Sequence, residues 1–157
     1  MNLFFINSFL AFGYMGVQGQ FSLSGFLAGF ALGYAALWIT QPLYGRSRYF
    51  QRAPKTAGLV GYFLMELVLS NLRVLWDVVT PRHISRPGIV GIPLRANTEM
   101  EILLVANLIS LTPGTLSIDL SEDRRTLYVH VMFLDDPDRF RKSITDGVER
   151  RVLEVMR

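Results

Sequence analysis

Two histidines and a group of three aspartates are the side chains of this sequence best suited to acid–base or metal chemistry. His83 lies in a basic, proline-rich connection, and His130 lies in the middle of an expected strand, with no carboxylate at ligand spacing from either. Asp135, Asp136 and Asp138 lack the alternation and the terminal glutamate of a calcium-binding loop. We therefore interpret the histidines as surface or sheet-face residues and the aspartates as helix caps, and we predict no metal site and no cofactor.

Glu66 is the one carboxylate in the apolar first half of the segment 57–80. With Arg73 and Asp77 it falls on one face of a helix, because the spacing follows multiples of the helical repeat. An ionisable group in a membrane environment is a candidate for function. The alternative is an ordinary polar-face residue that pairs with Arg73, so both interpretations of this candidate polar group stay open.

The other faces of segment 57–80 are apolar, and basic residues flank both of its ends. Because positive charge favours the cytoplasmic side of a membrane, both ends are expected on that side. The pattern predicts an amphipathic helix that lies in the interface, with a third membrane span as the alternative. The apolar positions are Leu59, Val60, Phe63, Leu64, Leu67, Val68, Leu72, Leu75 and Trp76.

The charged residues of the chain are confined to one part of it. All 16 basic and 13 acidic side chains lie between Arg46 and Arg157, and the first 45 residues carry none. The basic runs flank apolar stretches, which indicates membrane flanks and argues against nucleic-acid binding. Cysteine is absent, and so are the common hydrolase, zinc-protease and phosphate-loop motifs, so we predict that the chain is not an enzyme.

Residues 1–44 predict a transmembrane hairpin, with helices over about 2–18 and 21–41 joined by a tight turn at Gln18–Gln20. Gly25, Gly29 and Gly33 are spaced by four residues, which places them on one stripe where another helix can approach closely. The basic segment 45–56 is expected to be a cytoplasmic loop. That orientation places the N-terminus and the rest of the chain on the cytoplasmic side.

Residues 88–157 predict a small cytosolic α+β domain of order β-α-β-β-α, with its helices on one face of the sheet. The expected strands cover 89–94, 116–121 and 126–134, and the expected helices cover 100–111 and 137–156. Thr98 with Glu101, and Asp136 with Pro137, have the pattern of helix starts. Thr112-Pro113-Gly114 is expected to end the first helix and reverse the chain.

The block from Asn107 to Thr115, NLISLTPGT, followed by Asp119 and by Tyr-Val-His130, resembles the E subunits of the Mrp/Mnh-type multisubunit cation/proton antiporters. The resemblance covers nearly the whole chain. It implies a non-catalytic accessory subunit in the bacterial cell (inner) membrane, which supports assembly and activity of a complex that exports Na⁺ in exchange for H⁺. It also implies that other antiporter subunits are the partners, and that the Gly25/Gly29/Gly33 stripe packs on a helix of one of them.

This implication agrees with the composition of the hairpin, because an ion pathway needs ionisable or wet polar groups along its depth. The alternative hypothesis is a membrane-anchored cytosolic module that binds a ligand or a soluble protein.

Overall fold

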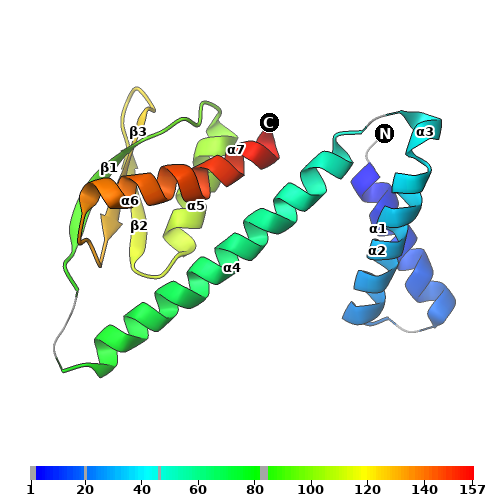
Figure 1. Ribbon diagram of the computed structural model, residues 1–157, viewed down its shortest axis with the longest axis horizontal. Helices are drawn as coiled ribbons and strands as arrows, with labels where there is room; N and C mark the ends of the chain where they lie inside the picture. Colours follow the sequence, from blue (N-terminus) through cyan, green and yellow to red (C-terminus); the bar gives the residue numbers. More distant parts are fainter. Residues whose placement is uncertain (1–2, 20, 46, 82–84) are drawn as a thin grey trace. The chain divides into compact units, whose positions relative to one another are not determined.

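The computed structural model describes residues 3–19, 21–45, 47–81 and 85–157. The chain divides into two compact units, Met1–Pro54 and Lys55–Arg157, which are described in turn. Gln20 of the expected turn and His83 lie outside the described residues. The predicted combination of a helical N-terminal region, a long apolar helix and a small antiparallel sheet with helices is confirmed (Figure 1).

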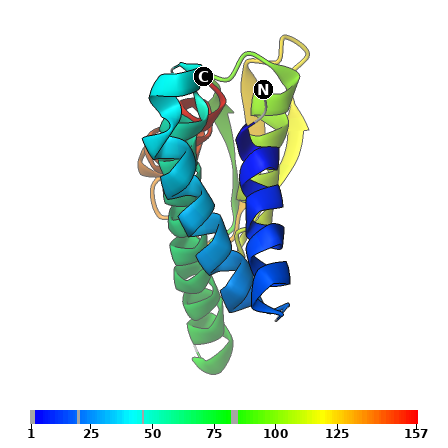
Figure 2. The same ribbon diagram turned by 90° about the vertical axis from the view of Figure 1, so that its right-hand side faces the viewer.

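The first unit is built on a helical hairpin. Helix α1 covers Leu3–Gln18 and helix α2 covers Leu23–Ile39. Gly19 follows α1 with a φ of 66°, a left-handed conformation that glycine adopts without steric cost. Ser22 then caps α2, since its side chain accepts a hydrogen bond from the N–H of Gly25. The two helices lie side by side in Figures 1 and 2.

Two sequence-based boundaries in this unit are wrong. The second helix does not continue to residue 41, because it ends at Ile39 and a short helix α3, Gln41–Tyr44, follows with Pro42 in its first turn. Segment 45–56 is not a loop throughout, because helix α4 (Tyr49–Val79) already begins at Tyr49. The tyrosine N–H bonds to the hydroxyl of Ser47, and its ring packs on Tyr34 of α2. These contacts stabilise a helix start that charge alone did not reveal.

Helix α4 has 31 residues and is therefore about 46 Å long. Within the described residues it is the one helix whose length and composition would allow it to cross a membrane; α1 and α2 are shorter apolar helices. Pro54 lies inside its second turn and removes one backbone donor there. From Lys55 onward the helix belongs to the second unit.

The rest of the second unit is an α+β module. Strands β1 (Gly88–Pro93), β2 (Thr115–Leu120) and β3 (Thr126–Val131) form an antiparallel sheet of order β1-β3-β2. Helix α5 (Glu99–Leu111) connects β1 to β2, and α6 (Pro137–Ser143), the π-helix η1 (Ile144–Glu149) and α7 (Arg150–Met156) follow β3. The last three run on continuously, as Figure 1 shows.

All the helices of the module cover one face of the sheet. Alternate residues of β1 and β3 point to that face and pack with α5 and with the C-terminal helices. The other face of the sheet stays exposed. The buried core consists of Val90, Ile92, Val105, Ile109, Leu127, Val129, Val131, Ile144, Val148 and Val152.

Both expected helix starts form. Thr98 and Glu101 make a capping box, in which each side chain accepts a hydrogen bond from the other residue's backbone N–H. Asp136 caps α6 by accepting from the N–H groups of Asp138 and Arg139, with Pro137 at the first helical position. These caps fix where α5 and α6 leave the sheet, and so they set the geometry described next.

Candidate functional site

Gly29 and Gly33 mark a close approach of two helices, as predicted, but the partner is α1 of the same chain. A Cβ atom on Gly29 would lie 3.0 Å from both the Cα and the carbonyl oxygen of Ala11. A Cβ atom on Gly33 would collide with the side chain of Asn7. Within this chain, α1 therefore occupies the close approach at these two residues, and packing of the stripe on a neighbouring subunit stays a prediction. Gly25 is partly buried in the first turn of α2.

Asn7 is a fully buried polar residue of the hairpin. Its amide donates a 2.8 Å hydrogen bond to the hydroxyl of Tyr49 in the first turn of α4. The amide oxygen has no hydrogen-bond partner among the described residues and faces Gly33. The asparagine thus joins three helical segments of the first unit.

In the second unit, α4 turns one face toward the α+β module. Tyr62 packs on the core, and the guanidinium of Arg151 lies 3.8 Å from its ring centroid. Glu66, Ser70 and Asp77 lie on the same side of the helix as Tyr62, because they follow it at intervals of four, four and seven residues. Asp77 is 2% exposed, and its Oδ1 accepts the N–H of Ser85 at 3.1 Å. The structure thus keeps the predicted polar face together, while the carboxylate of Asp77 caps the connection to β1.

The opposite face of α4 is apolar and exposed. Its large apolar side chains expose about half or more of their surface, from 48% for Leu69 to 71% for Val79. A face of this kind is suited to contact with lipid or with another protein. Among the described residues, no other element of the second unit covers them. They are Val60, Leu64, Met65, Val68, Leu69, Leu72, Leu75, Trp76, Val78 and Val79.

A pocket of about 430 Å³ lies between α4 and the α+β module. Glu66, Ser70 and Arg73 form its α4 wall, and Asp135, Asp136 and Arg139 stand opposite. No ion pair within the described residues involves Glu66, Arg73, Asp135 or Arg139. The remaining wall is mostly apolar, from Tyr62, Ile109, Thr112, Pro113, Gly114, Thr115, Val131, Phe133, Leu134, Phe140, Ser143, Ile144 and Val148.

Thr112-Pro113-Gly114 reverses the chain between α5 and β2 and forms part of this pocket. The hydroxyl of Thr112 donates to the carbonyl of Leu108 at 3.0 Å, and Gly114 adopts a φ of 86°. Thr115 then donates to the carbonyl of Ile109 at 2.6 Å. These bonds satisfy the free carbonyls at the end of α5, which supports the structural role expected for the block.

The other residues of the family-like block point away from the core. Asn107 lies on the exposed side of α5, and Asp119 is exposed on β2. His130 lies on the uncovered face of the sheet, in register with Ile89 and Leu116. None of these three side chains meets another polar residue in a way that suggests catalysis.

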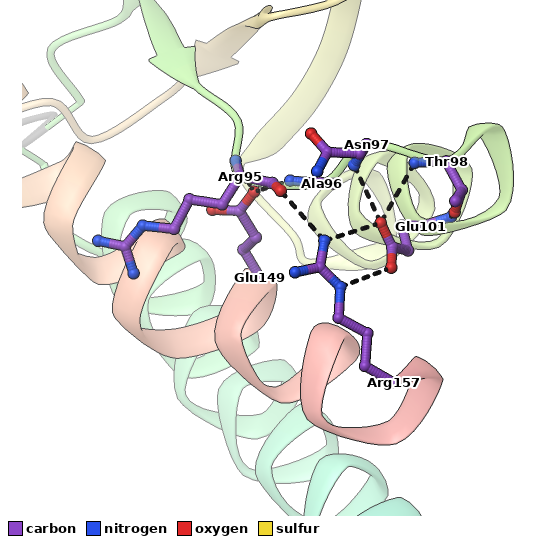
Figure 3. Close-up of polar contacts among 7 residues, drawn as sticks. All are labelled: Arg95, Ala96, Asn97, Thr98, Glu101, Glu149 and Arg157. Atoms are coloured by element: carbon purple, nitrogen blue, oxygen red, sulfur yellow. Dashed lines mark hydrogen bonds and ion pairs between the residues drawn. The ribbon is translucent and has the colours of Figure 1, made fainter.

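A buried polar cluster that the sequence did not reveal joins the C-terminal helix to the connection between β1 and α5 (Figure 3). Glu149 is fully buried, and its Oε1 accepts the backbone N–H groups of Arg95 and Ala96. Its Oε2 has no hydrogen-bond partner among the described residues. A glutamate beside the apolar stripe of an expected helix gives no sign of burial, so no sequence signal identified it.

Glu101 is the second buried acid of this cluster. Its carboxylate accepts the Nε–H of Arg157 at 3.0 Å and the N–H of Asn97 at 2.9 Å. The hydrogen bond from Arg157 and those from the backbone lower the pKa of Glu101 to about 2. The same pairing raises the pKa of Arg157. Glu101 and Arg157 therefore both stay charged around neutral pH, and their ion pair joins the end of α7 to α5.

The described residues contain no group of three or more acidic or histidine side chains arranged to hold a metal ion. The features that remain for function are the pocket, the apolar face of α4 and the exposed face of the sheet. These are surfaces for binding and packing, and such surfaces are typical of a chain that works within an assembly.

The profile of a family described as "Na+/H+ ion antiporter subunit" matches residues 7–155. The chain belongs to this family. Its relatives include the E subunit of the Na(+)/H(+) antiporter of Bacillus subtilis strain 168, 34% identical with 97% of this chain and 96% of the relative covered. The corresponding E subunit of Alkalihalophilus pseudofirmus OF4 is 33% identical, with 96% and 95% covered.

Two solved structures contain chains that are similar to this one. A chain of the Mrp complex from Dietzia sp. DQ12-45-1b is 29% identical, with a TM-score of 0.51 over 65% of this chain and 96% of that one. A chain of the archaeal membrane-bound sulfane sulfur reductase shares the fold, with a TM-score of 0.57, 20% identity and 96% of each chain covered.

The predicted family, function and partners are thereby confirmed: the chain is a subunit of a multisubunit membrane Na⁺/H⁺ antiporter. The family match favours this function over the alternative of a membrane-anchored cytosolic module that binds a ligand or a soluble protein. It also agrees with the prediction that the chain is a transporter component and not an enzyme.

Proposed function

We propose that this subunit is a non-catalytic accessory part of the antiporter, which anchors an α+β module at the membrane and supports assembly and activity of Na⁺ efflux coupled to H⁺ uptake. The observation that carries the proposal is the absence of Asp, Glu, Lys and Arg from the first 45 residues. Transport of Na⁺ or H⁺ through a bilayer requires ionisable or hydrated polar groups along the path. The ions therefore pass through other subunits.

Helix α4 lies in the membrane interface and does not cross the bilayer in this proposal. The α+β module accompanies α4 from Tyr62 to Asp77, a stretch of about 22 Å. If α4 crossed the hydrocarbon core, charged residues of the module such as Arg139 and Arg151 would enter it. Each charge at the centre of a bilayer costs about 3 kcal/mol or more. An in-plane helix avoids this cost, with its apolar face toward the lipid and its polar face on the module.

The orientation of the chain follows from its charges. The α1–α2 hairpin inserts into the membrane. The basic residues at the start of α4, Arg48 just before the helix and Arg52 and Lys55 within it, stay on the cytoplasmic side. Both termini and the α+β module are then cytoplasmic. Because the natural chain has no cysteine, single cysteines at Glu122 or Ser143 should resist membrane-impermeant reagents in intact cells and react in everted vesicles. Labelling from outside intact cells would overturn this orientation.

Asn107, Asp119 and His130 are proposed contacts for a neighbouring subunit, because they are at least partly exposed and lie beside exposed apolar residues such as Leu103 and Leu116. A photo-reactive amino acid at Asn107 should cross-link to another antiporter subunit. The same amino acid at Glu122, in the β2–β3 turn, is the matched control. Equal cross-linking at the two positions would argue against a contact at Asn107.

Purification tests the accessory role. The tagged chain, extracted in mild detergent, should bring several polytopic antiporter subunits with it. Recovery of the tagged chain from the membrane without any other antiporter subunit would contradict the proposal.

A further inference from the structure

The pocket between α4 and the α+β module is not used by the proposed function. Its volume of about 430 Å³ falls in the range of small-molecule sites, about 300–1,000 Å³. It lies within one structural unit and draws its walls from α4, the Thr112–Thr115 turn, the end of β3 and α6. A hollow of this size with convergent charges suggests a ligand.

The charges in this pocket are mixed. Its lining residues include Arg73 and Arg139, which carry guanidinium groups, and Glu66 and Asp135, which carry carboxylates. All of these but Glu66 are exposed to solvent. None of the four forms an ion pair with another described residue. Asp136 is a fifth charge, but its Oδ1 is already engaged by the N–H groups that begin α6. Asp136 keeps its negative charge while it caps α6, so the three carboxylates and two guanidinium groups of the lining sum to about −1. Glu66 also accepts a hydrogen bond from the hydroxyl of Tyr62.

A pocket lined by charges of both signs discriminates between ligand types by simple electrostatics. A ligand with only negative charge would face two carboxylates, and a ligand with only positive charge would face two guanidinium groups. A zwitterion satisfies both pairs, since arginine forks suit a phosphate and carboxylates suit an ammonium that donates hydrogen bonds.

The apolar part of the wall limits the ligand further. Phe133, Leu134 and Phe140 line the pocket beside its charges, so the ligand should combine a charged head with hydrocarbon. The position of α4 in the membrane interface, which is part of the proposed function, would place the pocket at the depth of lipid headgroups.

We propose that this pocket binds a phosphoethanolamine group carried by a membrane phospholipid. Arg73 and Arg139 hold the phosphate, Glu66 and Asp135 accept hydrogen bonds from the primary ammonium, and the phenylalanines contact the glycerol and the first carbons of the acyl chains. The lipid thereby joins the α+β module to the membrane surface beside α4.

Native mass spectrometry of the purified antiporter complex, supplied with phosphatidylethanolamine, phosphatidylcholine or phosphatidylglycerol, tests this site. The wild-type complex should retain phosphatidylethanolamine preferentially. The double variant Arg73→Gln/Arg139→Gln should reduce that retention by about tenfold or more, because each loss removes a charged hydrogen bond. Arg125→Gln is the matched control, since Arg125 is exposed in the β2–β3 turn and its side chain does not line the pocket. Equal retention in the double variant and the control would overturn the proposal.

Two further arms separate the alternatives. Asp135→Asn removes one carboxylate assigned to the ammonium and leaves two carboxylates against two guanidinium groups. The preference should therefore move toward phosphatidylglycerol; an unchanged preference counts against the assigned charges. Water-soluble glycerophosphoethanolamine should compete poorly, and displacement of the lipid at equal concentration would overturn the lipid as the source of the headgroup. The same spectra report the other subunits, so loss of lipid from an intact complex, as predicted for the double variant, is distinct from a failure of the proposed accessory role.

Discussion

Replacing Gly29 by alanine tests how closely α1 and α2 pack in the hairpin, and Gly13→Ala on α1 provides a matched control. The new Cβ would lie 3.0 Å from the Cα and the carbonyl oxygen of Ala11 and from the Cβ of Tyr14. Ordinary carbon–carbon contacts lie at about 3.5–4.0 Å, so α1 and α2 must separate by about half an ångström. Two of the three obstructing atoms are backbone atoms, so rotation of a side chain cannot relieve the contact.

The matched control is Gly13→Ala on α1, where a Cβ would meet no atom within 4 Å. Both substitutions gain the same helix propensity, about 1 kcal/mol per glycine replaced. This term cancels in the difference between the two variants. Overpacking costs about 1–3 kcal/mol, so Gly29→Ala should be less stable than Gly13→Ala by that amount.

Thermal unfolding of the full-length chain in detergent, followed by tryptophan fluorescence, measures this difference. Gly29→Ala should unfold at a lower temperature than Gly13→Ala, which should match or exceed the wild type. Gly29→Ala as stable as Gly13→Ala would refute the close contact between α1 and α2.

Three further predictions concern the α+β module. Glu101→Gln should lower the free energy of unfolding at pH 7 by about 1–2 kcal/mol, a value reduced by the exposure of Arg157 to water. The pKa of Glu101 in the folded protein, about 2, lies below the usual 4.5. The difference between variant and wild type in thermal unfolding should therefore shrink as the pH falls from about 4.5 toward 2. Glu149→Ala leaves the N–H groups of Arg95 and Ala96 without their acceptor and should lower the free energy of unfolding by about 2–4 kcal/mol. Glu149→Gln keeps an oxygen at that place and should lower it clearly less. Equal losses of stability for the two variants in urea unfolding would contradict the hydrogen bonds shown in Figure 3. Gly114→Ala should lower the free energy of unfolding by about 1–2 kcal/mol, because alanine is strained in the left-handed backbone conformation of this residue. The new Cβ adds no steric clash, since it would lie at an ordinary 3.5 Å from Phe133. Unchanged stability would show that the backbone of the turn can adopt another conformation.

Local signals explain why the sequence predicts most of the module. Thr98 with Glu101 and Asp136 with Pro137 act within one helical turn, so their caps could be predicted from spacing alone. The alternation of Leu127, Val129 and Val131 likewise predicts a strand with one buried face. Here the stabilising interactions lie close in sequence to the residues that they order.

The features that could not be predicted depend on distant partners. The start of α4 at Tyr49 depends on Asn7 and Tyr34, which lie far away in sequence. The burial of Glu149 depends on backbone donors at Arg95 and Ala96. The glycine stripe of α2 predicts that another helix approaches closely, but it does not specify which helix. In the structure, α1 of the same chain packs against Gly29 and Gly33.

The pocket shows the same limit for the candidate site. Spacing places Glu66 and Arg73 on one side of a helix, but only the fold brings Asp135 and Arg139 to face them. The exposed sheet face around His130 also follows from strand order β1-β3-β2, which no local pattern specifies.

Antiport in everted membrane vesicles tests the central claim, that this chain supports transport but carries no ion. Deleting the chain should abolish or strongly reduce Na⁺-dependent proton movement, and the wild-type chain should restore it. Glu66→Gln should restore most of it, because this side chain takes no part in ion transfer and the amide oxygen of glutamine still accepts hydrogen bonds in the proposed lipid site. Loss of antiport by Glu66→Gln in a fully assembled complex, or unchanged antiport after deletion, would contradict the claim.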